Sequence, residues 1–251
     1  MRKIVIANQK GGVGKTTTAV NLAAGLVYSG KRTLAIDMDP QANLTFATLG
    51  PADPTATIYD LLVNHSSIPE VKLAVEHMGL DLIPSNIDLA AAEVDLIATM
   101  GRHKLLSTRL TADPLNYDFV IIDAPPSLGL LTINALVAAT EIIIPVSTSI
   151  FALRGISRLQ STIDMVKQRL NRADLSIAGI LCTMYDHTNV AIDVHKLIRH
   201  HFGELTFKTV IPKNVKLEEA HSRAESVFGY APHSKGAEAY ARLVQEVLDR
   251  G

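Results

Sequence analysis

Residues 3–17 read KIVIANQKGGVGKTT, a short apolar run that passes into a glycine-rich segment carrying two lysines. Gly11, Gly12 and Gly14 let the backbone turn sharply and point its N–H groups inward, where they form an anion-binding concavity. A helix that starts here adds its positive end to the same place. The stretch therefore predicts a strand, a phosphate-binding loop and a helix in direct succession.

The segment departs from the common pattern G-x-x-x-x-G-K-[ST] at one position, because Gln9 stands where the pattern has its first glycine. Lys15 is placed to hold the β- and γ-phosphates of a nucleotide, Thr16 to ligate Mg²⁺ and Thr17 to support the α-phosphate. A glycine-rich turn that binds nothing is the alternative, and the residue types between strand and helix argue against it. Lys10 is a second charge that phosphate binding within one chain does not require.

Two further predicted strand ends carry carboxylates. FVIIDAPPS places Asp123 at a strand tip, where it can reach the shell of a magnesium ion through water. AIDMDPQAN places Asp37 and Asp39 beyond another strand, and Pro40 stiffens the turn. Neighbouring acids repel unless a cation or a proton separates their roles. We therefore expect one to face the metal or pack under the loop and the other to address the attacking nucleophile. Asp123 could instead be an ordinary strand-end carboxylate, and Asp37 or Asp39 could instead be a helix N-cap.

The rest of the chain alternates short apolar segments with segments of helical periodicity. Near-continuous apolar runs, typical of strands covered on both faces, lie at residues 3–8, 33–39, 80–85, 118–124, 141–147, 176–184 and 207–212. Helical periodicity marks residues 15–30, 155–170 and 236–250. This order predicts a single doubly wound α/β domain, residues 1–251, with a mainly parallel sheet of about seven or eight strands. Residues 50–69 predict a loop with one short helix.

Composition limits the partners and the compartment. The chain has 24 basic and 25 acidic residues, so any contact with nucleic acid needs a local basic patch. Cys182 is the single cysteine and lies in an apolar run, which predicts a buried, inert thiol in a reducing cytosol. The N-terminus lacks the apolar core of a signal peptide, and no apolar stretch approaches the ~20 residues of a spanning helix. We expect a soluble, cytoplasmic protein.

With these elements together the sequence resembles the ParA/Soj/MinD family of deviant P-loop ATPases, whose mark is KGGxGKT with an extra lysine ahead of the glycines. The resemblance covers nearly the whole chain. The segments that look like the small chromosomal ParA (Soj) branch are YDFVIIDAPPSLGLLTINALVAA, TMYD, FKTVIPKNVKLEEA and SKGAEAY. It implies an ATPase that uses ATP and Mg²⁺.

The resemblance also implies a role for each lysine. In this family the early lysine, here Lys10, reaches across a dimer interface to the phosphates bound by the other protomer, which links dimerisation to ATP occupancy. Lys15 acts within its own chain, Thr16 and Asp123 serve Mg²⁺, and Asp39 matches the acid that positions the attacking water. The implied catalytic residues are thus Lys10, Lys15 and Asp39.

The residues that the resemblance places around the nucleotide come from two parts of the chain. Met184, Pro212 and Asn214 are implied to lie near the adenine, although each could instead belong to the core or to a turn. The full implied set is Lys10, Gly11, Gly12, Val13, Gly14, Lys15, Thr16, Thr17, Met184, Pro212 and Asn214.

The resemblance further implies that an ATP-bound homodimer binds double-stranded DNA without sequence preference. The candidates in the C-terminal third are Lys196, Arg199, Lys213, Lys216, Arg223 and Lys235. Lys216 stands where the family usually has a DNA-contacting arginine, and His187 where it often has another. A histidine is mostly uncharged at neutral pH, so this contact is weakened or pH-sensitive. The alternative is an ordinary solvated basic face.

The segment Ser147–Gly155 departs from the family, because Ser149 and Arg154 stand where relatives usually have acidic residues. Partner peptides that stimulate this family are commonly basic, so we expect a cargo-bound activator that differs from a standard ParB. The C-terminal ARLVQEVLDRG lacks the basic amphipathic extension with which MinD docks on membranes, so we expect no membrane binding.

The resemblance thus implies an ATPase that moves or spaces a cargo over the nucleoid. Two alternatives remain: a DNA-associated regulator or scaffold of the same fold, and a metabolic ATP-dependent enzyme of the same superfamily.

Overall fold

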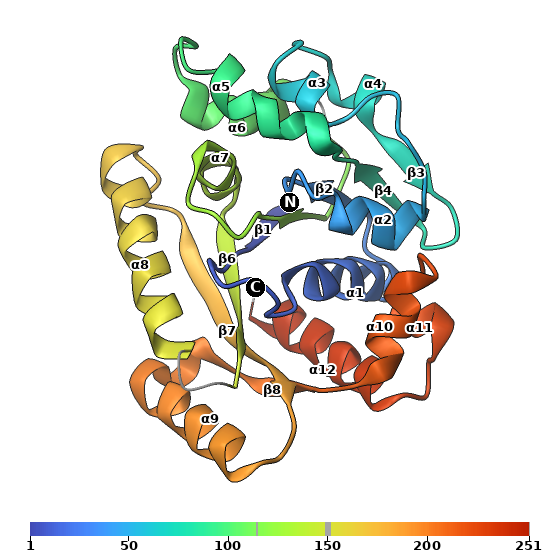
Figure 1. The fold of residues 1–251 in the computed structure, drawn as a ribbon, viewed down its shortest axis with the longest axis vertical. Helices are drawn as coiled ribbons and strands as arrows, with labels where there is room; N and C mark the ends of the chain where they lie inside the picture. Colours follow the sequence, from blue (N-terminus) through green and yellow to red (C-terminus); the bar gives the residue numbers. More distant parts are fainter. Residues whose placement is uncertain (114, 149–151, 251) are drawn as a thin grey trace.

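One eight-stranded sheet forms the centre of the computed structural model, which describes residues 1–113, 115–148 and 152–250 (Figure 1). The strand order is β3-β4-β2-β5-β1-β6-β7-β8. Strand β3 pairs antiparallel with β4 at one edge, and the other seven strands are parallel. The strands are β1 (Arg2–Ile6), β2 (Thr33–Asp37), β3 (Leu73–Val75), β4 (Leu80–Ile83), β5 (Phe119–Asp123), β6 (Glu141–Ser147), β7 (Ser176–Tyr185) and β8 (Thr206–Pro212).

Helices cover both faces of this sheet (Figure 1). One face carries α1 (Lys15–Tyr28), α2 (Asn43–Leu49), α10 (Val215–Ser222), α11 (Val227–Tyr230) and α12 (Lys235–Asp249). The other face carries α3 (Ile58–Leu62), α4 (Ile68–Val71), α5 (Ala92–Asp95), α6 (Leu105–Ala112), α7 (Leu130–Ala138), α8 (Ala152–Arg169) and α9 (Asn189–Phe202). Short 3₁₀ turns are η1 (Ile87–Ala91), η2 (Arg102–Lys104) and η3 (Gly203–Leu205).

The burial of strand β1 on both faces of the sheet explains why its sequence is a continuous apolar run. Ile4 and Ile6 point into the core under α1 and α12, whereas Val5 points into the core on the opposite face. A strand buried on both faces must be apolar at nearly every position.

The chain leaves β1 and β6 in opposite directions, through helices on opposite faces of the sheet. This arrangement opens a crevice at the carboxyl ends of the central strands, where α/β proteins bind ligands.

The predicted α/β fold class is confirmed, and each of the seven predicted apolar runs overlaps a strand. Strand β3 was not predicted, because its three residues are too few to show a pattern. Residues 50–69 contain the expected short helix, α3, and a second helix, α4, begins at the end of this range. Cys182 is buried as predicted, and burial raises the pKa of its thiol to about 12. None of the helices in the described ranges is long and apolar enough to cross a bilayer.

The first prediction concerns the close approach of α1 and α12. A Cβ atom on Gly25 would lie 2.5 Å from Cγ2 of Val244 and 2.9 Å from Cε2 of Phe228. Alanine suits a helix interior better than glycine by about 0.5–1 kcal/mol, but overpacking a core costs about 1–3 kcal/mol. We therefore expect Gly25→Ala to lower the free energy of unfolding, measured by chemical denaturation.

The matched control is Gly229→Ala, since the nearest atom to its added Cβ, Oε2 of Glu225, lies at 3.5 Å. This control should leave the unfolding free energy unchanged or slightly raised. A Gly25→Ala protein as stable as the parent would show that α1 and α12 are not closely packed.

Candidate functional site

The loop between β1 and α1 has the geometry of an anion-binding concavity. Gly12 and Gly14 have φ angles of 68° and 80°, in the left-handed region that favours glycine, and Gly14 directly precedes α1. A Cβ atom on Gly11 or Gly12 would meet no heavy atom within 4 Å, so the space over this part of the loop is open. The predicted order of strand, glycine loop and helix is therefore present.

Polar side chains from distant elements hold this loop in place. Thr183 of β7 donates its hydroxyl to the carbonyl of Val13 at 2.9 Å, and Thr18 donates its own to the carbonyl of Gly14 at 2.7 Å. Asn8 donates its amide to the carbonyl of Pro145 at 2.7 Å. Sequence reasoning missed all three anchors. Asn8 could have been noticed as a polar residue at a strand end, but no signal connects Thr183 to a loop 170 residues away.

The two lysines of the loop lie in different environments. Lys15 is buried in the first turn of α1, whereas Lys10 is exposed and its Nζ lies 3.3 Å from Oγ of Ser147. Burial lowers the pKa of Lys15, and the nearby carboxylates of Asp123 and Asp39 act in the opposite direction. Lys15 therefore belongs to the interior of the site, and Lys10 to its surface.

Asp123 supplies the buried carboxylate at the carboxyl end of β5. Its Oδ2 accepts a hydrogen bond from the hydroxyl of Thr16 at 2.6 Å, while Oδ1 is buried with no hydrogen-bond partner among the described residues. Burial, and the neighbouring charge of Asp37, raise the pKa of Asp123 well above its usual range. An unsatisfied buried oxygen beside a threonine hydroxyl suits a hydrated cation such as Mg²⁺.

A metal here would depend on more than protein ligands. Within the described residues there is no group of three or more histidine, cysteine, aspartate or glutamate side chains that could hold a metal ion. Magnesium commonly binds through one or two protein ligands together with phosphate oxygens and water. The donor set of Thr16 and Asp123 fits that mode of binding.

The structure separates the neighbouring acids that follow β2. Oδ2 of Asp37 accepts hydrogen bonds from the backbone N–H and the hydroxyl of Thr45, both at 2.8 Å. Its Oδ1 accepts a third from the backbone N–H of Asp39 at 3.0 Å. Asp37 is fully buried, and this burial raises its pKa to about 6. Asp37 thus packs beneath the turn, and Asp39 is the acid close enough to Lys15 to raise its pKa.

The residues predicted to lie near an adenine base are brought together. Met184, Pro212 and Asn214 line one cavity of about 90 Å³, and Gly14 and Thr17 of the phosphate loop line it as well. Thr183 and Tyr240, which were not predicted, complete part of its wall. A base bound in this cavity would lie beside phosphates bound by the loop, as the two parts of one nucleotide require.

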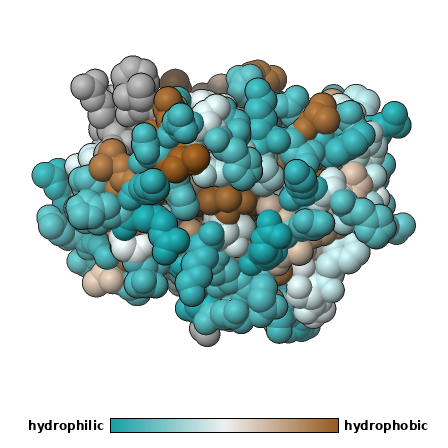
Figure 2. All heavy atoms as spheres, turned by 90° about the horizontal axis from the view of Figure 1, so that it is seen from below, coloured by the Kyte–Doolittle hydropathy of each residue, from teal (hydrophilic) through white to brown (hydrophobic). Residues whose placement is uncertain are grey.

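The predicted DNA-binding residues lie in two areas of the surface. Lys196 and Arg199 belong to α9, whereas Lys213 precedes α10 and the other three lie on or beside α10–α12. Five of the six are exposed, and Lys216 is half-buried with its Nζ 2.6 Å from Glu219. Figure 2 shows the end of the molecule where α9 lies, and hydrophilic residues dominate it with apolar residues in small separate groups.

The structure describes His187 but only part of the segment Ser147–Gly155. Ser149 lies outside the described residues, and so does the side chain of Arg154, so the predicted change in the partner-binding segment stays a prediction. His187 is exposed, with its ring edge against Tyr185 at a centroid distance of 4.7 Å.

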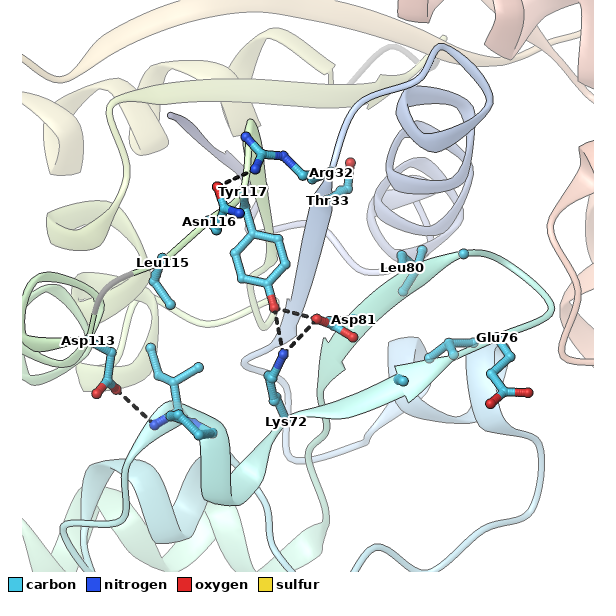
Figure 3. Close-up of a pocket in the computed structure, with 15 residues that line it drawn as sticks. Arg32, Thr33, Lys72, Glu76, Leu80, Asp81, Asp113, Leu115, Asn116 and Tyr117 are labelled. Atoms are coloured by element: carbon cyan, nitrogen blue, oxygen red, sulfur yellow. Dashed lines mark hydrogen bonds and ion pairs between the residues drawn. The ribbon is translucent and has the colours of Figure 1, made fainter.

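A larger cavity of about 560 Å³ lies at the opposite edge of the sheet, by the amino ends of β2, β4 and β5 (Figure 3). Two of its charged groups, Lys72 and Asp81, are already joined to each other. Lys72 is 2.9 Å from Asp81 and 3.3 Å from the hydroxyl of Tyr117, which also donates to Asp81. The polar groups that converge on the glycine loop therefore make the carboxyl edge the better candidate site.

Comparison with known proteins gives full-length relatives. Residues 1–177 match a family model described as an AAA domain. The chain is 47% identical to the sporulation initiation inhibitor protein Soj of Bacillus subtilis, over 99% of this chain and 98% of the relative. It is 44% identical to the chromosome-partitioning ATPase Soj of Treponema pallidum, again over 99% and 98%.

A solved structure extends the comparison to bound ligands. Cobyrinic acid a,c-diamide synthase from Mycobacterium smegmatis, with a bound ATP analogue and magnesium, matches with a TM-score of 0.84 and 35% identity. The match covers 99% of this chain and 94% of that one.

The second prediction tests the bonds that hold Asp37 under the turn. Thr45→Val removes the hydroxyl that donates to Asp37 and that accepts the backbone N–H of Ser85 at 2.8 Å. Leaving buried polar groups without a partner costs about 1–3 kcal/mol, so the free energy of unfolding should fall by that amount in urea denaturation.

Thr48→Val is the control, because among the described residues this buried hydroxyl donates only to the carbonyls of Leu44 and Thr45 in its own helix. It should cost clearly less than Thr45→Val. Equal losses for the two variants would contradict the structural role of the Thr45 hydroxyl.

Proposed function

The chain belongs to the ParA/Soj family of P-loop ATPases, and from that premise we propose that it hydrolyses ATP as a switch. In this proposal the ATP-bound chain forms a dimer that binds double-stranded DNA without sequence preference. A cargo-bound adaptor protein then stimulates hydrolysis and release. The cycle moves or spaces a cargo on the nucleoid, in the cytoplasm and without membrane binding, and residues 1–251 act as one domain.

The observation that carries this proposal is the division between the two lysines of one loop. Lys15 is buried beside the carboxylates, where it can neutralise phosphate within its own chain, and Lys10 is exposed at the rim. A surface charge at the edge of a phosphate site can reach a nucleotide held by a second copy. Such a contact forms only on association, so ATP binding and dimerisation become linked.

The site supports ATP hydrolysis by residues with separate tasks. The loop N–H groups and Lys15 hold the phosphates, Met184, Pro212 and Asn214 hold the adenine, and Asp39 positions a water for in-line attack on the γ-phosphate. Attack breaks the bond to the bridging oxygen and yields ADP and phosphate.

Thr16 and Asp123 would hold the magnesium ion, and its charge would neutralise phosphate oxygens. The solved relative that holds an ATP analogue and magnesium supports both ligands for this chain.

Two other functions compete with a partitioning switch. The solved structure that is 35% identical is a cobyrinic acid a,c-diamide synthase, which favours a metabolic ATP-dependent synthetase for this chain. The chain is, however, more similar in sequence to the two Soj proteins. A synthetase requires a small substrate for turnover, whereas a switch dimerises and hydrolyses ATP without one. A DNA-bound scaffold would bind DNA independently of ATP turnover.

The third prediction separates the two lysines. Lys15→Ala should abolish ATP binding, because the buried cation that faces the phosphates is lost. Lys10→Ala should keep nucleotide binding and lose the ATP-dependent dimer. Binding is measured with a fluorescent ATP analogue, and mass by light scattering with ATP and Mg²⁺. A Lys10→Ala protein that dimerises and turns over like the parent would refute the role of Lys10 across the interface.

The fourth prediction concerns Asp39. Asp39→Ala should bind ATP, dimerise and bind DNA, but hydrolyse ATP about 100-fold or more slowly, because the water loses the group that positions it. Phosphate release measures the rate, and a DNA mobility shift with ATP measures the retained state. A variant that hydrolyses ATP at the parent rate would remove Asp39 from the mechanism.

A further inference from the structure

Four side chains form a compact cluster on α10 and α11. Lys216 and Glu219 lie one turn apart on α10, Arg223 follows the helix, and Tyr230 ends α11. Nζ of Lys216 is 5.7 Å from the centre of the Tyr230 ring, and Cζ of Arg223 is 5.8 Å from it. We call these four residues the α10 cluster. Its two cations both belong to the predicted DNA-binding set.

The acid of the cluster is held by two of its neighbours. Oε2 of Glu219 accepts hydrogen bonds from Nζ of Lys216 at 2.6 Å and from the hydroxyl of Tyr230 at 2.8 Å. These two bonds lower the pKa of Glu219, so the side chain is a carboxylate at neutral pH. The ammonium group of Lys216 therefore already contacts an anionic oxygen.

Such a pair competes with DNA by simple chemistry. A carboxylate oxygen and a phosphate oxygen bind an ammonium group in the same way. An ion pair whose two side chains are still partly open to solvent contributes little to stability, so it exchanges readily for another anion. A phosphate that approaches Lys216 must displace Glu219 or lie beside its negative charge, and both reduce the gain from the contact.

We propose that Glu219 is a built-in competitor that lowers the affinity of the α10 cluster for the phosphate backbone of double-stranded DNA. This inference rests on the proposed function, since it concerns the DNA contact of the ATP-bound dimer. It identifies Glu219 as the residue that keeps this contact weak, which allows the dimer to leave DNA.

The experiment compares Glu219→Gln with the parent in binding to random-sequence duplex DNA at several salt concentrations, with ATP and Mg²⁺. Glutamine keeps the length of the side chain and a carbonyl acceptor for Tyr230, but removes the charge. Affinity should rise by up to about tenfold near 0.1 M salt. The slope of log affinity against log salt should steepen by up to about 0.9, the value for one added phosphate contact.

Two controls test whether the gain in affinity comes from the pairing of Glu219 with Lys216. Glu204→Gln makes the same change of net charge at an exposed position in η3, away from the α10 cluster, and should leave the affinity nearly unchanged. In a Lys216→Ala background, Glu219→Gln should lose most of its effect. An undiminished gain in that background would overturn the pairing with Lys216.

The outcomes distinguish a failure of this inference from a failure of the proposed function on which it rests. A parent protein that does not bind DNA with ATP would refute the DNA-binding part of the proposed function. A parent that binds, with a Glu219→Gln variant of equal affinity and slope, would refute only the competitor. If Glu219→Gln is misfolded by circular dichroism, Glu219→Ala serves instead, because it also removes the charge that contacts Lys216. It should also raise the affinity, and an unchanged affinity would overturn the proposal.

Discussion

The hydrogen bond between Thr16 and Asp123 is the contact on which the site depends. It joins the first turn of α1 to the carboxyl end of β5 at 2.6 Å, in a place where both Asp123 and Lys15 are buried. Buried charges are costly unless they are paired, and the second oxygen of Asp123 has no partner among the described residues. The arrangement favours the binding of a cation and an anion together, which is what Mg²⁺ and a nucleotide supply.

The same helix connects the phosphate loop to the C-terminal third of the chain. Thr18, which caps the loop carbonyl of Gly14, also shares a hydrogen bond of 3.2 Å with the buried hydroxyl of Tyr240 in α12. Asn21 donates to the carbonyl of Thr17 at 2.8 Å and accepts the backbone N–H of Val227 in α11 at 2.7 Å. The helices beside the predicted DNA-binding residues are thus hydrogen-bonded to the helix that starts at the nucleotide loop.

Sequence reasoning reached the fold and the centre of the site because both depend on local patterns. Strands buried on both faces must be apolar, and the glycine loop with its lysine and threonines is contiguous in the chain. The contacts of Thr183 and Tyr240 with the loop and with α1 were out of reach, because each depends on which distant elements the fold packs together. The pairing of Glu219 with Lys216 is local to α10, and sequence reasoning missed it. The residues by themselves left the separate roles of Asp37 and Asp39 open, and the resemblance alone implied that Asp39 positions the water. The hydrogen bonds from Thr45 of α2 show that Asp37 is the acid fixed beneath the turn.

The central claim is that the two lysines of one loop serve two different nucleotides, and mixing two inactive variants tests it most directly. One variant carries Lys10→Ala and the other Asp39→Ala, and the ATPase rate of each alone and of their equal mixture is measured. If Lys10 acts on the partner's nucleotide, a mixed dimer contains one complete site. The mixture should then hydrolyse ATP faster than either variant alone, because one of the two sites of each mixed dimer is intact. A mixture no more active than its two components would place Lys10 at the nucleotide of its own chain and contradict the account.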